Sequence, residues 1–160
     1  MILTDVNVTD LDEVLELNEA SVPHLSSIHS EQLRWFADHA AYFRVVRRAD
    51  ALVGFLIGLR PGLAYTSPNY QWFARHYNDF AYIDRVATHP SARRLGVASM
   101  LYDDFADQLG DEVAVLTCEV NLRPPNDASM RYHQRHGFVA VASQETEGGT
   151  KKVALMERRL

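Results

Sequence analysis

The sequence predicts one mixed α/β domain spanning residues 1–160, and three observations support this fold class. Residues 42–47 and 52–59 form two β-rich runs around a short polar turn. Residues 113–120 are almost entirely apolar, as expected for a strand covered on both faces. Between residues 98 and 109, apolar side chains recur at helical spacing. With 47% hydrophobic residues, a chain of this length can bury a core without disulfides or a structural metal.

The first part of the chain is predicted to contain a strand, two helices and a β-hairpin. The strand covers residues 2–8. Asp10 is placed to cap the first helix, with Glu13 three residues later completing a capping box. Ser30 is placed to cap the second helix. The two β-rich runs then pair through a turn at residues 48–51.

Residues 60–79 interrupt the regular pattern with a concentration of aromatic side chains. Loops of this length are uncommon unless they carry function or contain short helices of their own. Tyr65, Tyr70 and Trp72 are our candidates for contacts with a substrate, because aromatic rings can shape a pocket or stack on a cation. Packing of these rings under the loop is an equally favoured alternative.

The second half of the chain alternates strands and helices. Expected strands cover residues 80–88, 113–120, 138–142 and 153–157, and expected helices begin near residues 98 and 126. Gly110 and Gly137 follow these two helices as C-terminal stops. The predicted order of elements is therefore β-α-α-β-β-β-α-β-α-β-β.

Charge and composition exclude several classes of function. The formal net charge of −5 argues against binding to nucleic acid, although arginines and lysines gather in local groups that suit a small polyanionic ligand. No apolar stretch approaches the roughly 20 residues that span a bilayer. Residues 1–5 lack the pattern of a secretory signal, so we expect a cytoplasmic protein with no membrane partner.

Metal binding and thiol chemistry are also disfavoured. The single cysteine, Cys118, excludes an internal disulfide and a multi-cysteine metal site, and a buried core position is its simplest interpretation. The seven histidines show no pair at metal-ligand spacing. We therefore expect no metal.

A candidate phosphate-binding turn lies at residues 93–98, between a predicted strand and a predicted helix. Backbone N–H groups in such a turn, together with the positive end of the helix, can bind an anion. Gly96 and Ala98 have little or no side chain to obstruct it, and Arg93 and Arg94 add positive charge. A single glycine between a strand and a helix is common, so the turn alone is a weak signal.

Together with its neighbours, the turn resembles the central motif of the GNAT N-acetyltransferase superfamily. That motif is Arg or Gln, two variable residues, Gly, one variable residue, then Gly or Ala, preceded by a strand and a proline. Residues 86–98 match it without gaps. A second family motif matches residues 126–138, with one departure: His133 stands where the family usually has Tyr, and Tyr132 lies one residue too early.

The resemblance implies a GNAT-like fold and a binding mode for acetyl-CoA. The fold is a twisted mixed sheet of about seven strands with about four helices, in which the strands at 80–88 and 113–120 splay apart. The pantetheine arm of acetyl-CoA would pair with the backbone of the first of these strands, and the pyrophosphate would rest on the turn. The implied cofactor contacts are Val86, Ala87, Thr88, Arg93, Arg94, Leu95, Gly96, Val97, Ala98, Asn126, Ser129 and His133.

The implied activity is transfer of an acetyl group from acetyl-CoA to a primary amine of a small molecule or peptide, through a ternary complex. Residues 65–73, 118–121 and 124–126 resemble a group of bacterial predicted acetyltransferases of unassigned substrate. The resemblance thus supplies the cofactor and leaves the acceptor open, and a homodimer is a possible state. A module that binds acyl-CoA without catalysis is the alternative, while a nucleotide-binding domain is disfavoured because the phosphate-loop lysine is missing.

Three residues are candidates for catalysis. His133 occupies the position of the family's general acid and can act as acid, as base or only as a contact of the thioester. Glu119, near the end of the 113–120 strand, is the leading candidate for a base, and Asp84 is its rival. A carboxylate in an apolar strand needs a partner, so an ion pair with an arginine is the structural alternative. An ordered water in place of a direct base stays open.

Overall fold

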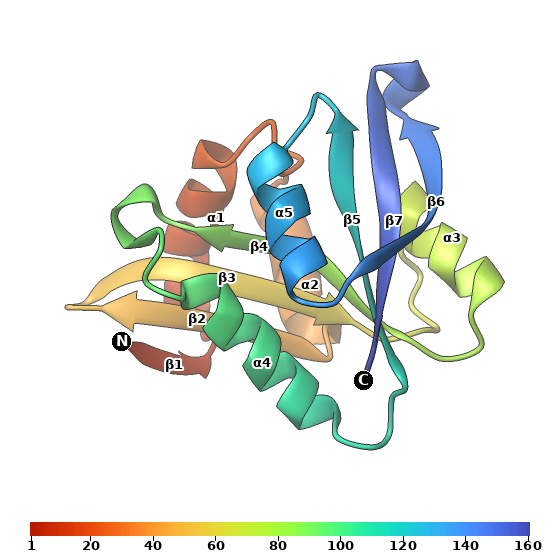
Figure 1. Ribbon diagram of the computed structural model, residues 1–160. Helices are drawn as coiled ribbons and strands as arrows, with labels where there is room; N and C mark the ends of the chain where they lie inside the picture. The colour runs from red at the N-terminus through yellow and green to blue at the C-terminus, as the bar shows by residue number, and fades with distance from the viewer. The chain divides into compact units, whose positions relative to one another are not determined.

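The computed structural model describes all residues from 1 to 160 and divides into two compact units. The first comprises residues 1–59 and 83–109, and the second residues 60–82 and 110–160. Strand β4 (Ala81–Thr88) begins in the second unit and continues into the first. Hydrogen bonds link the seven strands in the order β1-β2-β3-β4-β5-β7-β6 (Figure 1). The mixed α/β class predicted from the sequence is confirmed.

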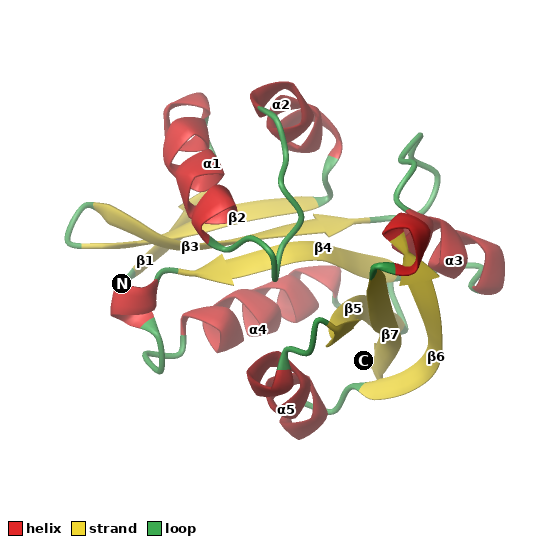
Figure 2. Ribbon diagram, turned by 90° about the horizontal axis from the view of Figure 1, so that it is seen from above, coloured by secondary structure: helices red, strands yellow, loops and turns green.

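The first unit is an antiparallel set of strands with helices on both faces. Its elements besides the end of β4 are β1 (Ile2–Asp5), α1 (Leu11–Ala20), α2 (Ser30–His39), β2 (Tyr42–Arg48), β3 (Ala51–Leu59) and α4 (Val97–Leu109). Figure 2 shows α1 and α2 on one face of these strands and α4 on the other. The hairpin turn between β2 and β3 is confirmed, with Ala49 and Asp50 in the left-handed region at φ 48° and 67°.

The close packing of α4 on β3 depends on two glycines of the strand. An ideal Cβ on Gly54 would lie 2.4 Å from Cγ1 of Val97, and one on Gly58 would lie 2.2 Å from the ring of Phe105. Val97 and Phe105 are buried on the inner side of α4. The missing side chains of β3 therefore set how near the helix approaches, and with it the position of the turn at residues 93–96.

Gly58→Ala is expected to destabilise the fold by about 1–3 kcal/mol, because the added methyl group overpacks the contact with Phe105. Urea-induced unfolding measures this change. Combining it with Phe105→Leu should restore part of the lost stability, since the smaller side chain leaves room for the methyl group. A change for Gly58→Ala within about 0.5 kcal/mol of zero would show that the helix does not depend on this approach.

The second unit joins parallel and antiparallel strands. Its elements besides the start of β4 are α3 (Pro68–His76), β5 (Val115–Arg123), α5 (Asp127–Arg135), β6 (Val139–Thr146) and β7 (Lys151–Arg159). Ala81 and Tyr82 pair in parallel with Leu116 and Thr117 of β5. β7 then pairs antiparallel with both β5 and β6. The parallel step brings Tyr82 next to the residues of β5 that lead to Glu119.

Helix α3 lies in the aromatic segment that interrupts the sequence pattern, and it makes five α-helices where about four were expected. Ser67 caps it, accepting a hydrogen bond from the Tyr70 N–H at 3.4 Å, and Pro68 occupies its first turn. This Ser-Pro pair is a helix-start signal that was available in the sequence. Tyr70 and Phe73 form the buried side of the helix.

Asp10 lies at the N-cap position of α1, as expected, but it makes no side-chain cap hydrogen bond there, so the predicted capping box with Glu13 is wrong. The Asp10 carboxylate accepts from the backbone N–H of Asn7 at 2.9 Å and from Arg47 at 2.6 Å, and Glu13 also binds Arg47. Asp10 therefore closes the 3₁₀ turn Val8–Asp10 that precedes α1. Helix α2 starts at Ser30 with His29 in the cap position, one residue before the expected cap. None of the helices is long and apolar enough to cross a membrane.

Candidate functional site

The turn at residues 93–96 exposes its backbone at the start of α4. Arg94 and Gly96 adopt left-handed φ values of 64° and 80°, with Leu95 between them. The Leu95 N–H donates to the Ala92 carbonyl at 3.3 Å, which closes the turn, and residues 93–96 are exposed. Val97, in contrast, is buried and anchors the helix. The turn thus presents backbone and two arginines at the positive end of a 13-residue helix, an arrangement suited to an anion.

Strand β4 leads into this turn with alternating exposure. Val86 and Thr88 are partly exposed, whereas Arg85, Ala87 and the side chain of Asp84 are buried. The strand therefore has one face in the core of the first unit and one face that is accessible. The accessible face carries the residues expected to run beside the pantetheine arm.

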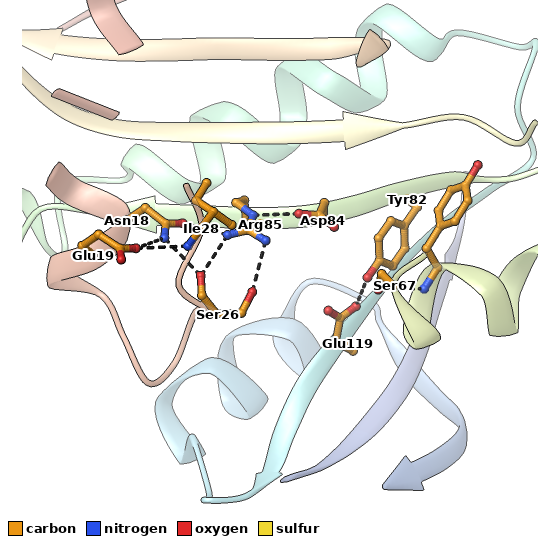
Figure 3. Close-up of polar contacts among 10 residues, drawn as sticks. Asn18, Glu19, Ser26, Ile28, Ser67, Tyr82, Asp84, Arg85 and Glu119 are labelled. Carbon is orange, nitrogen blue, oxygen red and sulfur yellow. Dashed lines mark hydrogen bonds and ion pairs between the residues drawn. The ribbon is translucent and has the colours of Figure 1, made fainter. Parts of the chain in front are cut away.

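Asp84 is held in a buried ion pair. Its carboxylate accepts from Nε of Arg85 at 2.7 Å, and both side chains are at most 4% exposed. The Arg85 guanidinium also donates to the Asn18 side chain at 2.9 Å and to the Ser26 carbonyl at 3.0 Å (Figure 3). It lies over the Phe36 ring. The charge of Asp84 is thus already balanced, which favours the structural alternative for this residue.

Glu119 is bound by a tyrosine. The Tyr82 hydroxyl donates to Oε2 of Glu119 at 2.5 Å (Figure 3). Tyr82 is fully buried, with its ring 5.7 Å from that of Tyr70 and 5.8 Å from that of Phe73. Glu119 is partly exposed. The structure therefore presents a carboxylate that is bound by a buried donor and belongs to a partly exposed residue.

The contact of Tyr82 with Glu119 could not be predicted from the sequence alone. A tyrosine in an apolar strand reads as a core residue, and only the pairing of β4 with β5 shows what its hydroxyl contacts. A polar tip on a buried ring usually has a hydrogen-bond partner, and that rule was the available signal.

The three aromatic candidates for substrate contacts take different positions. Tyr70 is 1% exposed, and its hydroxyl donates to the Arg60 carbonyl at 2.8 Å. These contacts favour a role in core packing over contact with a substrate. Trp72 is partly exposed and stacks on His76 with the ring centres 3.9 Å apart. Tyr65 is partly exposed beside Tyr70. Tyr65 and Trp72 remain accessible to a substrate.

Helix α5 carries the second motif. Asn126 caps the helix, accepting a hydrogen bond from the Ser129 N–H at 3.3 Å. His133 is 5% exposed, with its ring edge-on to Phe138 at 5.2 Å. Its Nδ1 lies 2.7 Å from the Ser129 carbonyl oxygen. Because a carbonyl oxygen can only accept, Nδ1 carries the proton, and Nε2 is the atom that can accept one.

The protonation of His133 follows from its surroundings. Burial lowers the pKa of the ring below its ordinary value of 6.5, the hydrogen bond to Ser129 opposes this shift, and the nearby His136 adds to it. The ring is therefore neutral at pH 7. A neutral ring protonated on Nδ1 is suited to accept a proton at Nε2, which favours the base or contact interpretation over a general acid.

Cys118 is fully buried next to Glu119. Burial, and after it the charge of Glu119, raises the pKa of its thiol well above its usual range. The un-ionised thiol is not a nucleophile, in keeping with a core position.

Comparisons with known proteins identify the fold and the family. A family model described as the acetyltransferase (GNAT) family matches residues 11–138. Ard1 from Thermoplasma volcanium is similar in structure, with a TM-score of 0.80 and 20% identity over 99% of this chain and 97% of that one. Chaetomium thermophilum Naa20, solved with a bisubstrate analogue, has a TM-score of 0.77 and 15% identity over 100% of this chain and 87% of that one.

A bacterial structure is also similar. The ribosomal-protein-S18-alanine N-acetyltransferase from Escherichia coli has a TM-score of 0.74 and 15% identity, over 99% of this chain and 92% of that one. No curated protein matches the sequence.

Proposed function

Because the chain belongs to the GNAT acetyltransferase family, whose model covers residues 11–138, we propose that it transfers the acetyl group of acetyl-CoA to a primary amine. The observation that carries this proposal is the exposed turn at residues 93–96, which presents its backbone and two arginines at the start of α4. Family membership makes the protein an acyltransferase. The acyl donor and the acceptor are the parts proposed here.

The proposed cofactor contacts lie on strand β4 and on the turn that joins it to α4. The pyrophosphate binds the amide groups of residues 94 and 96–98, since the Leu95 N–H donates to Ala92, and Arg93 adds charge from the rim. The pantetheine arm runs beside Val86, Ala87 and Thr88, whose strand has one accessible face. The N–H of Val86 is the proposed donor to the oxyanion that forms on the thioester carbonyl.

The proposed reaction needs one protein base, which takes the single proton that the amine loses. The amine nitrogen attacks the thioester carbon, its proton passes to the Glu119 carboxylate directly or through a water, and CoA leaves as a thiolate. A thiol has an ordinary pKa of about 8.5, so the thiolate can leave without a protein acid. This fits a neutral His133, which has no proton to give from Nε2. Alignment of the two substrates supplies much of the remaining acceleration.

The first acceptor class to test is the α-amine of a peptide or protein. One similar structure is named as an N-acetyltransferase of an alanine in ribosomal protein S18, and another was solved with a bisubstrate analogue. The partly exposed rings of Tyr65 and Trp72 are the proposed contacts for such an acceptor.

Thiol release from acetyl-CoA tests the function directly. The assay offers peptides with different N-terminal residues, free amino acids, lysine side chains and polyamines, and mass spectrometry identifies the acetylated product. Turnover with an amine supports the proposal. Binding of acetyl-CoA without thiol release for any amine favours the alternative, a non-catalytic acyl-CoA-binding module. Failure to bind acetyl-CoA refutes both.

His133 is expected to be neutral, with its proton on Nδ1, throughout the range above pH 6.5. In ¹⁵N-histidine NMR spectra its titration midpoint should lie below 6.5, because burial disfavours the charged ring. The unfolded chain binds a proton near pH 6.5 that the folded ring does not, so the free energy of unfolding falls as pH falls below 6.5.

The variant His133→Gln assigns the signal and should reduce this loss of stability at low pH. A midpoint above 6.5, or a proton on Nε2, would contradict the assignment of His133 as a proton acceptor.

A further inference from the structure

We infer that Tyr82 is a positioning residue that holds the Glu119 carboxylate, in its ionised form, in the orientation needed to accept the amine proton. The inference rests on the proposed function. Its physical basis is one hydrogen bond, from the Tyr82 hydroxyl to Oε2 of Glu119 at 2.5 Å (Figure 3). Tyr82 acts through Glu119 and is not itself placed against the substrate.

The register of the sheet determines this contact. Tyr82 pairs with Thr117 of β5, and Glu119 follows two residues later. Since alternate residues of a strand share a face, Thr117 and Glu119 project on the same side of β5, and the length of the tyrosine ring spans the remaining distance. Thr117 itself donates to the Ala81 carbonyl at 3.0 Å, which ties the two strands together at this level.

The ring of Tyr82 has little freedom to move. It is fully buried, and the rings of Tyr70 and Phe73 from α3 lie 5.7 and 5.8 Å away. Tyr70 is fixed in turn by its hydrogen bonds with the Arg60 carbonyl and the Leu63 N–H. Helix α3 thus has a second role: its aromatic rings pack against Tyr82, and Tyr82 binds the Glu119 carboxylate. A donor on so rigid a support loses little entropy when it orients its partner.

A hydrogen bond donated to a carboxylate favours the ionised form, which is the form that acts as a base. Other titratable groups lie on the elements around β5, including Lys151, Lys152, Arg158 and Arg159 on β7 and Asp127, Arg131 and Arg135 on α5. Glu157 on β7 is bound by the Tyr77 hydroxyl at 2.7 Å, His133 lies on α5, and Cys118 is buried beside Glu119. Tyr82→Phe removes this hydrogen bond and leaves those charged groups in place.

Tyr77 and Glu157 provide a matched control. They form a second tyrosine-to-carboxylate hydrogen bond in the same unit, and Glu157 pairs with Thr117 across β5 and β7. Tyr77→Phe removes the same kind of bond from a nearby carboxylate to which no catalytic role is given.

The test compares the pH dependence of kcat/KM for Tyr82→Phe, Tyr77→Phe and the wild type with one amine. The ratio of variant to wild type at each pH cancels the titration of the amine. For Tyr82→Phe the acid limb should move up by about one pH unit, because the ionised carboxylate loses a hydrogen bond. At pH values on this limb the rate should fall about tenfold, with KM for acetyl-CoA within twofold of the wild type. Tyr77→Phe should leave the profile unchanged.

A double-mutant cycle separates action through Glu119 from a general effect on packing. Tyr82→Phe keeps the ring, and thermal unfolding verifies that the variant is folded. In a Glu119→Gln background, Tyr82→Phe should change the remaining rate by less than twofold. An equal loss in both backgrounds, or an acid limb that does not move, would overturn the inference. Absence of turnover by the wild type with every amine would instead count against the proposed function.

Discussion

Glu119→Gln is expected to lower kcat by about a hundredfold to ten-thousandfold, with the Kd of acetyl-CoA within twofold of the wild type. The amide keeps the size of the side chain and removes its ability to take a proton. Glu119 is a partly exposed residue of β5, and a buried tyrosine binds its carboxylate, as a fixed base requires. Steady-state thiol release measures kcat, and calorimetry measures the affinity for acetyl-CoA.

Glu157→Gln is the matched control for this prediction. Glu157 lies on the strand next to β5 and also accepts a hydrogen bond from a tyrosine, so its change removes a similar charge from the same unit. It should leave kcat within about twofold. If Glu119→Gln lowers kcat no more than this control does, the proton leaves by another route, such as ordered water, and Glu119 is not the base.

Gly96→Glu is expected to weaken acetyl-CoA binding by at least about a hundredfold. The residue is exposed in the turn at the start of α4, where the added carboxylate would repel the pyrophosphate and obstruct its approach. An added Cβ would meet nothing within 4 Å, so it makes no steric clash in the turn. The left-handed φ of 80° adds backbone strain of about 1 kcal/mol.

Two variants separate charge from strain. Gly96→Ala carries the backbone strain alone and should weaken binding by less than about tenfold. Gly62→Glu adds the same charge at another left-handed glycine, at φ 94° and with equally open surroundings, in the aromatic segment. It should leave the affinity unchanged. Calorimetric titration of acetyl-CoA into each variant measures these effects, and an unchanged affinity for Gly96→Glu would remove the turn from the cofactor site.

The fold could be predicted well where local pattern decides it. The β2–β3 hairpin, helix α4 and helix α5 all lie close to their expected residues, because turn glycines, caps and periodic apolar residues act over a few neighbours. Helix α3 was the element missed, since aromatic crowding around it hid a short Ser-Pro helix start. Asp10 lies at the expected N-cap position, but the capping box with Glu13 was wrong because the Asp10 carboxylate binds Arg47, which lies 37 residues away.

The candidate site likewise has features that follow from local sequence and features that depend on contacts between distant residues. The turn at residues 93–98 and the motif around His133 are contiguous segments, so the sequence by itself determined the family and where its motifs lie. The state of the candidate catalytic groups was decided only by the tertiary structure. Glu119 is bound by a tyrosine 37 residues earlier, and Arg85 joins Asn18, 67 residues away. The protonation of His133 follows from its burial in the folded chain. Each is a contact or a desolvation that exists only after distant segments have packed, and no local pattern encodes it.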